Sequence, residues 1–276
     1  LFFTKADFNG LTDLYAEITG PGTTVGEVKT STMAQADWTV NGKYYVIPYN
    51  GMAAKQMGET VTVTIRNARG SIVGQTSDSI SEYVQRNLGK QEALVKTMFV
   101  DMLNYGAAAQ TNFNWKADQL ANSWMTEADQ ALGTAELKPC GDCRVSTGNY
   151  AGSNLSLESR ISMQYFFTGV QTKNLYAVVK FTSHVLGSAE TTIRVENENI
   201  ALNGKYRIVK VEDIVVADGR QLVDCDLYDA DTNQLLGSVT DSMESYVYRQ
   251  ATGSYEWMKT IMKFSDSAYA YLHRND

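Results

Sequence analysis

The chain has few histidines that could act as the base for a serine or cysteine nucleophile. Its 276 residues include two histidines, His184 and His273. Neither lies near a serine or cysteine nucleophile motif, and no Gly-x-Ser-x-Gly sequence occurs. The glycines form no phosphate-binding loop. These absences argue against a nucleophilic hydrolase, because parts of a catalytic triad are missing.

Carboxylate chemistry needs fewer parts. A glycosidase requires only two Asp or Glu side chains at a suitable separation, and the chain has 31 acidic residues. The small β-rich lobes inferred below, however, lack the long barrel that usually carries such a site. We therefore predict a protein that is not an enzyme, and keep a glycosidase as the least favoured hypothesis.

The three cysteines give a weak metal signal. Cys140 and Cys143 form a single Cys-x-x-Cys motif, whereas tetrahedral zinc needs four ligands. The remaining candidates are Cys225, His184 and His273, and no sequence around the motif resembles thioredoxin. We expect a local disulfide or two free thiols in preference to a metal site, and a buried Cys225.

An acidic run in the second half could supply oxygen ligands to calcium. It lacks the glycine and the distal glutamate of an EF-hand loop, and Asp and Asn are common turn residues. We predict a solvated hairpin turn, and we assign the chain no metal and no cofactor. The run consists of Asp224, Asp226, Asp229, Asp231 and Asn233.

The sequence contains an internal repeat, so the secondary-structure elements are expected to occur twice. Asn41-Gly42-Lys43-Tyr44 returns as Asn203-Gly204-Lys205-Tyr206, and Phe2-Phe3-Thr4 returns as Phe166-Phe167-Thr168. Three further matches occur in the same order at nearly the same offset, which indicates an internal repeat. The second half has an additional strand-like segment, residues 155–164, before its Phe-Phe-Thr. The first half begins at that Phe-Phe, so either a strand has been cut away or the first lobe lacks it, and we take the chain to be an excised fragment.

Each half is expected to run from strands to helices. Residues 61–65 alternate in polarity as a half-buried strand does, and a turn and a return strand follow. A short helix over residues 79–87, capped by Ser79 or Asp78, precedes a longer helix over residues 91–110. Its counterpart in the second half covers residues 254–272.

These patterns predict an α+β fold: a tandem pair of β-sandwich-like lobes, each followed by C-terminal helices. The expected domains are residues 1–136 and 137–276. Residues 117–122 and a capping box at Thr126 predict short helical turns in the connection between them.

The aromatic residues are sorted by their counterparts in the other half. Trp38 aligns with Ile200 and Trp257 with Leu94 on the helix stripe, so both are expected in the core. Tyr45 aligns with Arg207, which favours exposure. Trp115 and Trp124 have no counterpart. For Trp115, a structural role as a lid over the seam between the lobes is weighed equally with ligand binding, whereas ligand binding is favoured for Trp124.

Exposed aromatic rings beside amides and charged groups suit a sugar, whose apolar ring face packs on them while its hydroxyls take hydrogen bonds. The same surface also suits a protein partner. The candidate ligand-binding residues are Trp115, Trp124, Tyr45, Tyr49, Tyr150, Asn114, Lys116 and Gln119.

The net charge of the chain limits the classes of partner that it is expected to bind. The formal net charge is −7, and nucleic acids or anionic membranes attract clustered Lys and Arg instead. No apolar run reaches the roughly 20 residues of a membrane span. We therefore predict no nucleic-acid partner and no membrane span, and a neutral ligand.

Three segments carry a family resemblance: residues 102–110 (Met-Leu-Asn-Tyr-Gly-Ala-Ala-Ala-Gln), 51–57 and 118–122. They resemble a repeat of secreted surface proteins of gut Clostridia, which often also carry dockerin modules. The two-lobed arrangement is similar to starch adherence system proteins of Ruminococcus, in which a bilobed groove binds α-1,4-glucan without cutting it.

The resemblance implies an extracellular protein, secreted or attached to a cell surface as part of an amylosome. It also implies a starch or maltooligosaccharide ligand in a groove between two lobes. Scaffold proteins are possible partners through modules outside this fragment. The alternative from a different class is a structural or protein-interaction module of a cell-surface scaffold.

Overall fold

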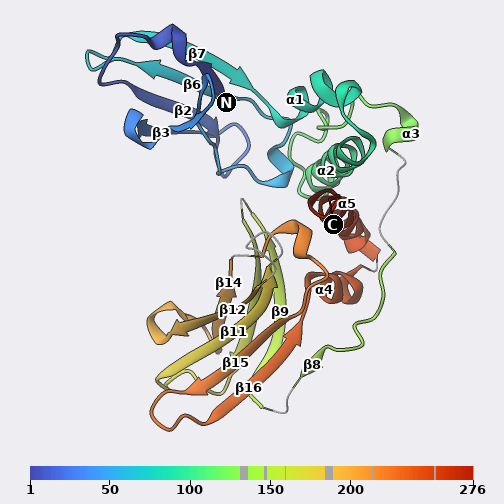
Figure 1. The fold of residues 1–276 in the computed structure, drawn as a ribbon. Coiled ribbons are helices and arrows are strands. Elements are labelled where there is room, and N and C mark those ends of the chain that lie inside the picture. The colour runs from blue at the N-terminus through green and yellow to red at the C-terminus, as the bar shows by residue number, and fades with distance from the viewer. Residues whose placement is uncertain are drawn as a thin grey trace. The chain divides into compact units, whose positions relative to one another are not determined.

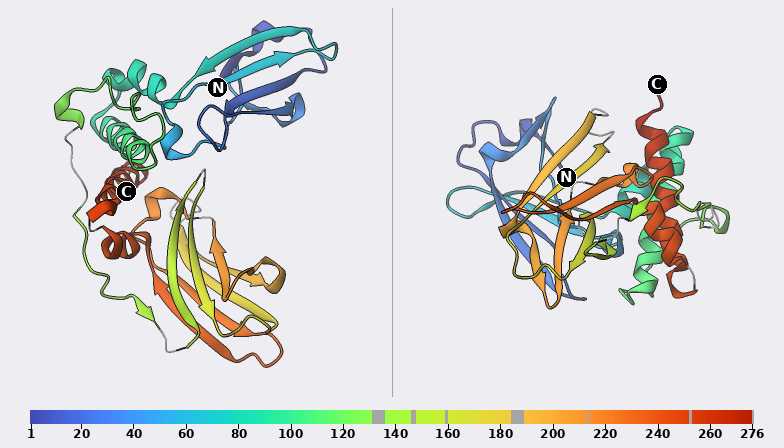
Figure 2. Two further views of the ribbon diagram at one scale, coloured as in Figure 1. Left: turned by 180° about the vertical axis from the view of Figure 1, so that it is seen from behind. Right: turned by 90° about the horizontal axis from the view of Figure 1, so that it is seen from below.

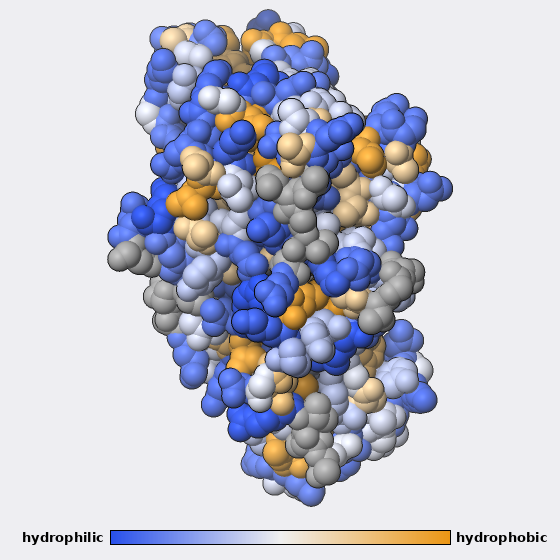
Figure 3. Space-filling model, turned by 90° about the vertical axis from the view of Figure 1, so that its right-hand side faces the viewer, coloured by the Kyte–Doolittle hydropathy of each residue, from blue (hydrophilic) through white to orange (hydrophobic). Residues whose placement is uncertain are grey.

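The chain forms a β-rich α+β fold in a computed structural model, as the sequence predicts at this level (Figure 1). The structure describes residues 1–130, 136–145, 148–158, 160–183, 189–212, 214–251 and 253–275. Four antiparallel sheets and a few helices make up this part of the chain. None of its helices is both long enough and apolar enough to cross a membrane. On the face shown in Figure 3, hydrophobic residues lie in small groups among hydrophilic ones.

The chain divides into two compact units, and the long helix α2 (Ala93–Asn112) gives residues to both. Unit 1 comprises residues 1–91 and 106–126, and unit 2 comprises residues 92–105 and 127–276. The single boundary near residue 136 stays a prediction about the two sequence repeats.

Unit 1 contains two sheets. The larger has the strand order β3-β2-β6-β7, and the smaller has the order β1-β5-β4. The predicted strand and its return strand are confirmed as the hairpin β6–β7. The strands are β1 (Phe2–Thr4), β2 (Tyr15–Pro21), β3 (Val28–Ala34), β4 (Thr39–Asn41), β5 (Tyr44–Val46), β6 (Val61–Arg66) and β7 (Ile72–Asp78).

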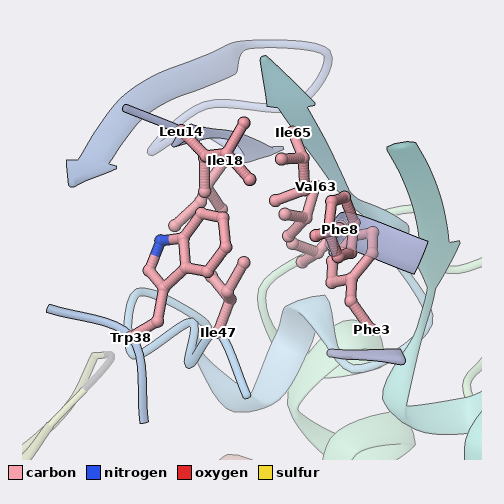
Figure 4. Close-up of a cluster of buried hydrophobic side chains, with 10 residues drawn as sticks. Phe3, Phe8, Leu14, Ile18, Trp38, Ile47, Val63 and Ile65 are labelled. Carbon is pink, nitrogen blue, oxygen red and sulfur yellow. The ribbon is translucent and has the colours of Figure 1, made fainter. Parts of the chain in front are cut away.

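The core of unit 1 joins side chains from both sheets (Figure 4). Val63 and Ile65 lie on β6, where their alternation with polar residues points them to one face. Ile47 follows β5, and Trp38, 6% exposed, confirms the core assignment made from its counterpart Ile200. Fully burying one such side chain contributes roughly 1.5–3 kcal/mol.

Unit 2 contains a four-stranded and a five-stranded sheet, with the orders β13-β14-β10-β9 and β12-β11-β15-β16-β8. The additional strand predicted over residues 155–164 is wrong in its bounds: these residues include the end of β9 and the beginning of β10, and the two strands pair with each other. The strands are β8 (Arg144–Val145), β9 (Tyr150–Leu157), β10 (Ile161–Thr168), β11 (Leu175–Ser183), β12 (Ala189–Glu196), β13 (Ala201–Asn203), β14 (Tyr206–Val211), β15 (Val223–Asp229) and β16 (Leu235–Asp241).

In each unit a short helix follows the last strand of the larger sheet: α1 (Ile80–Asn87) follows β7, and α4 (Met243–Gln250) follows β16. The Ser79 hydroxyl accepts from the Glu82 amide at 3.0 Å, and the Ser242 hydroxyl accepts from the Ser245 amide at 3.0 Å. The remaining helices are α3 (Glu127–Gln130) and α5 (Lys259–Leu272). Short 3₁₀ helices cover Lys5–Phe8, Gln35–Asp37, Ala54–Gln56, Leu88–Lys90, Asn197–Asn199, Val216–Asp218 and Gly253–Met258.

Some local predictions are wrong in detail. Residues 117–122 form turns and no helix. Leu94, expected on the buried stripe of α2, is 42% exposed, and Trp257 is only half-buried. The helix expected from Thr126 begins at Glu127, and its predicted end near Leu132 lies outside the described residues.

Residues 93–105 of α2 lie beside α5 in unit 2 (Figure 2). The rings of Tyr105 and Phe264 stack there with centroids 6.4 Å apart. Asp101 is 1% exposed, and neither of its oxygens makes a hydrogen bond of ordinary geometry to a described residue. Burial raises the pKa of Asp101 to about 6, against smaller lowering effects of the nearby Ser267 hydroxyl and of Lys263.

This pKa predicts that Asp101 lowers stability at neutral pH. The folded-state pKa of about 6 exceeds the usual 3.8, so the protonated carboxyl is the form that the folded state favours. The destabilisation is absent below about pH 4, grows as the pH rises to 6, and reaches roughly 3 kcal/mol above that.

Asp101→Asn should therefore raise the free energy of unfolding at pH 7.5 and change it little at pH 4 in urea titrations. The exposed Asp118→Asn serves as the control, and an equal effect of Asp101→Asn at both pH values would contradict the assignment.

Candidate functional site

The loop after α2 is anchored by a buried indole. Trp115 is 4% exposed, and its Nε1 donates to Glu59 Oε1 at 2.5 Å. Lys116 Nζ lies 2.6 Å from Glu59 Oε2. Lys55 Nζ stands 4.3 Å from the centroid of the indole. Trp115 therefore holds the loop to unit 1 and offers no open ring face, which corrects the expectation of an exposed indole.

A second buried contact fixes the other end of this loop. The Gln110 side chain, 1% exposed, donates to the Gln119 carbonyl at 3.1 Å and accepts from the Ala121 amide at 2.7 Å. Asn114 and Lys116 have φ angles of +50° and +44°, in the left-handed region. The loop is thus a tightly bonded turn, and two of its predicted site residues, Asn114 and Gln119, remain exposed.

The exposed aromatic of this loop is Phe113, which the sequence reasoning missed. It is 49% exposed, and Lys55 Nζ lies 5.4 Å from its ring centroid. Asn112, Asn114 and Gln119 are exposed around it in the sequence. We call Asn112, Phe113, Asn114 and Gln119 the Phe113 surface. The sequence signal that could have identified Phe113 is the end of the helix. Phe113 lies four residues after the buried Ala109, a spacing that would bury it within a helix, but α2 ends at Asn112, so Phe113 is exposed.

Trp124 is half-buried against the short helix α1. Its Nε1 donates to the Ser81 hydroxyl at 2.9 Å, and that hydroxyl donates to the Ala121 carbonyl. The indole N–H of Trp124 therefore already has a hydrogen-bond acceptor within unit 1.

The two predicted tyrosines Tyr45, on β5, and Tyr49, in the segment after it, are also partly buried. Tyr45 packs edge-on against Trp38 and Phe8, with centroids 5.3 and 6.3 Å away. The exposure inferred from its counterpart is wrong, because Arg207 is itself buried and hydrogen-bonded to Asn197. The Tyr49 hydroxyl donates to the Pro21 carbonyl at 3.4 Å, and burial raises the pKa of Tyr49.

Tyr150 belongs to unit 2, unlike the other seven predicted residues. Its ring meets Phe167 edge-on at 5.9 Å, and burial raises its pKa. The structure thus brings together Trp115 and Lys116 at Glu59, with Asn114 and Gln119 in the same loop. Trp124, Tyr45, Tyr49 and Tyr150 lie at other places.

Unit 1 also has a pocket of about 460 Å³ between β1 and α1. Phe2, Tyr49 and Tyr83 contribute aromatic rings to its wall, and Asp78 and Arg86 contribute an ion pair. Tyr49 is the one predicted site residue in this lining.

The groups considered for metal chemistry have structural roles. Cys140 and Cys143 form a disulfide, and Cys225 is fully buried, as expected. Asp229 Oδ1 accepts from the Asp231 and Thr232 amides at 3.1 Å each, which confirms the predicted hairpin turn. No group of three or more His, Cys, Asp or Glu side chains in the described ranges could hold a metal ion. His184 lies outside those ranges, and His273 stacks on Tyr269.

Comparisons with known proteins do not identify the chain. No family model matches it, and no curated protein matches it. Among solved structures, it aligns with a pair of C2-type domains, A and B, of Extended-Synaptotagmin 2 at 9% identity, over 92% of this chain and 77% of that chain. The TM-score of 0.22 is too low to support an argument about fold or function.

The contacts of Glu59 predict its contribution to stability. Glu59→Ala leaves the buried Trp115 N–H without its acceptor and removes the partner of Lys116, so the free energy of unfolding should fall by about 1–3 kcal/mol. Urea unfolding followed by tryptophan fluorescence measures this loss. Glu82→Ala, at an exposed position of α1, is the matched control. Equal stability of the two variants would show that the Glu59 contacts do not hold the loop.

Proposed function

We propose that this chain is a non-catalytic carbohydrate-binding module that recognises α-1,4-glucan, with the Phe113 surface as its contact. The observation that carries the proposal is the ring of Phe113, which is 49% exposed beside exposed amide side chains. Buried hydrogen bonds of Trp115 and Gln110 hold the loop that carries it.

A fixed loop favours sugar binding for an energetic reason. Ordering a flexible loop on binding costs free energy, and a loop already held by buried hydrogen bonds avoids most of that cost. The ring of Phe113 packs on the apolar face of a glucose unit, while the amides of Asn112 and Asn114 exchange hydrogen bonds with its hydroxyls. The net charge of −7 is compatible with a neutral ligand.

The choice of α-glucan, and of an extracellular or cell-surface location, rests on the family resemblance of residues 102–110 and 51–57. The proposal includes a tandem pair of β-sandwich-like lobes, which the equal pairing orders of β1-β5-β4 and β10-β14-β13 support. The groove between two lobes stays a prediction.

Affinity electrophoresis in gels containing amylopectin tests the proposal. The chain should migrate more slowly in amylopectin than in a plain gel, and Phe113→Ala should weaken this retardation by about ten-fold in apparent affinity, since the ring supplies the main apolar contact. Tyr255→Ala removes an aromatic ring of similar exposure, 48%, from unit 2 and should change nothing.

Unchanged mobility of the wild-type chain in amylopectin, together with no pull-down on granular starch, would overturn the proposal. It would leave the structural or protein-interaction module as the better interpretation. Retardation in xylan or cellulose gels alone would keep the class and change the sugar. Release of reducing sugar from soluble starch would contradict a non-catalytic role.

A further inference from the structure

A Schellman motif at the end of α2 fixes the positions of Phe113 and Trp115. The Trp115 amide donates to the Gln110 carbonyl at 2.8 Å, and the Asn114 amide donates to the Thr111 carbonyl at 3.3 Å. Asn114 takes the left-handed conformation that this motif requires, with a φ of +50°. The two aromatic residues on either side of Asn114 are therefore held in place by main-chain hydrogen bonds.

One lysine lies near both of these rings. Lys55 Nζ is 4.3 Å from the centroid of the Trp115 indole and 5.4 Å from the centroid of the Phe113 ring. The first ring is 4% exposed and the second 49%. The ammonium group of Lys55 is therefore placed by a buried ring beside the exposed ring to which the proposed function assigns a sugar.

The backbone that carries Lys55 is fixed by its neighbours. Ala54 and Gln56, which flank it in a short 3₁₀ helix, are both buried. The Gln56 side chain donates to the Gly22 carbonyl at 2.6 Å and accepts from the Ala53 amide at 2.9 Å. Lys55 itself is half-exposed, so part of its side chain remains accessible to a ligand.

The two lysines near this loop have different kinds of partner. Lys116 forms an ion pair with Glu59 at 2.6 Å, which occupies its charge with a carboxylate. Lys55 lies against ring faces instead. A ring face attracts an ammonium group without providing an oxygen acceptor, and an ammonium group has three N–H donors and no acceptor. Lys55 can therefore donate to oxygen atoms of a ligand.

We propose that Lys55 is a ligand-binding residue of the Phe113 surface, whose ammonium group donates a hydrogen bond to an oxygen of the glucose unit that packs on Phe113. This role rests on the proposed function, because it needs a sugar on that ring. The 5.4 Å between Nζ and the ring centroid leaves room for one hydrogen bond of about 2.9 Å to an oxygen at the edge of a stacked sugar. The sugar is the acceptor, since the ammonium group has only donors.

The aromatic contacts also reduce the entropic cost of this bond. A lysine side chain loses rotamer freedom when it becomes ordered on a ligand. Lys55 is already restrained by Trp115, whose indole is itself bonded to Glu59. A charge-assisted hydrogen bond is also stronger than one between neutral groups. We therefore expect Lys55 to contribute at least as much to affinity as the amide of Asn112 or Asn114.

Isothermal titration calorimetry with maltoheptaose, a neutral α-1,4-glucan, measures this contribution. Lys55→Met keeps an aliphatic side chain against the indole and removes the donors, so it should weaken binding by about ten-fold. Lys205→Met is the matched control, because Lys205 Nζ also lies over a ring, 5.3 Å from the centroid of Tyr206 in unit 2. It should leave the affinity unchanged.

Acylation of lysines gives a second readout, which a purely structural role of Lys55 would not change. The wild-type chain is treated with an N-hydroxysuccinimide ester, and the modified lysines are quantified by mass spectrometry. Saturating maltoheptaose should slow the modification of Lys55 and leave that of Lys205 unchanged. Urea unfolding of Lys55→Met, followed by tryptophan fluorescence, checks that the loop after α2 is still in place. If this variant is less stable, the acylation result alone decides.

Lys55 has no role in binding if a stable Lys55→Met variant binds maltoheptaose as tightly as the wild-type chain, or if the sugar leaves acylation of Lys55 unchanged. When either result accompanies a loss of binding in Phe113→Ala, the glucan proposal stands and only the role of Lys55 is overturned. Equal losses in Lys55→Met and Lys205→Met would indicate a general effect of charge and would overturn it too. No binding by the wild-type chain would overturn both proposals.

Discussion

The carboxylate of Glu59 is the contact on which the loop after α2 depends. It accepts from a buried indole N–H and from an ammonium group, so two residues of one loop are tied to the start of β6. Without this acceptor the buried indole N–H would be unpaired, at a cost of about 1–3 kcal/mol. Trp115 is held in the core by this contact, and Phe113, two residues earlier in the same loop, lies at the surface.

The segments that carry the family resemblance build the scaffold beneath this loop. A Cβ on Gly106 would lie 3.0 Å from Met57 Sδ and 3.2 Å from the Ala54 carbonyl, so a larger residue would force these neighbours to shift by a few tenths of an ångström. The buried Gln56 side chain donates to the Gly22 carbonyl at 2.6 Å and accepts from the Ala53 amide at 2.9 Å. Gln110 has a similar double role. These motif residues therefore have packing roles in unit 1, and the proposed ligand contact is assigned to other residues, those of the Phe113 surface.

The duplicated sequence predicted strands, hairpins and helix caps well, because local patterns determine them. The hairpins β6–β7 and β15–β16 and the Ser79 cap all follow from alternation, turn residues and capping preferences. Exposure was harder to predict. Arg207 was taken as a surface residue because it is charged, yet its guanidinium is buried beside Asn197. Trp115 could not be placed in the core without knowing that Glu59, 56 residues away, supplies its acceptor. The burial of Asp101 likewise depends on α5, a helix far along the chain.

A crystal structure of the chain soaked with maltoheptaose tests the central claim, that a loop fixed by Glu59 presents Phe113 to a glucan. We expect glucose units stacked on the Phe113 ring, with hydroxyls bonded to Asn112 or Asn114 and with the Trp115–Glu59 contact unchanged. Glucose units bound elsewhere while Phe113 stays bare, or no bound sugar at saturating concentration, would contradict it.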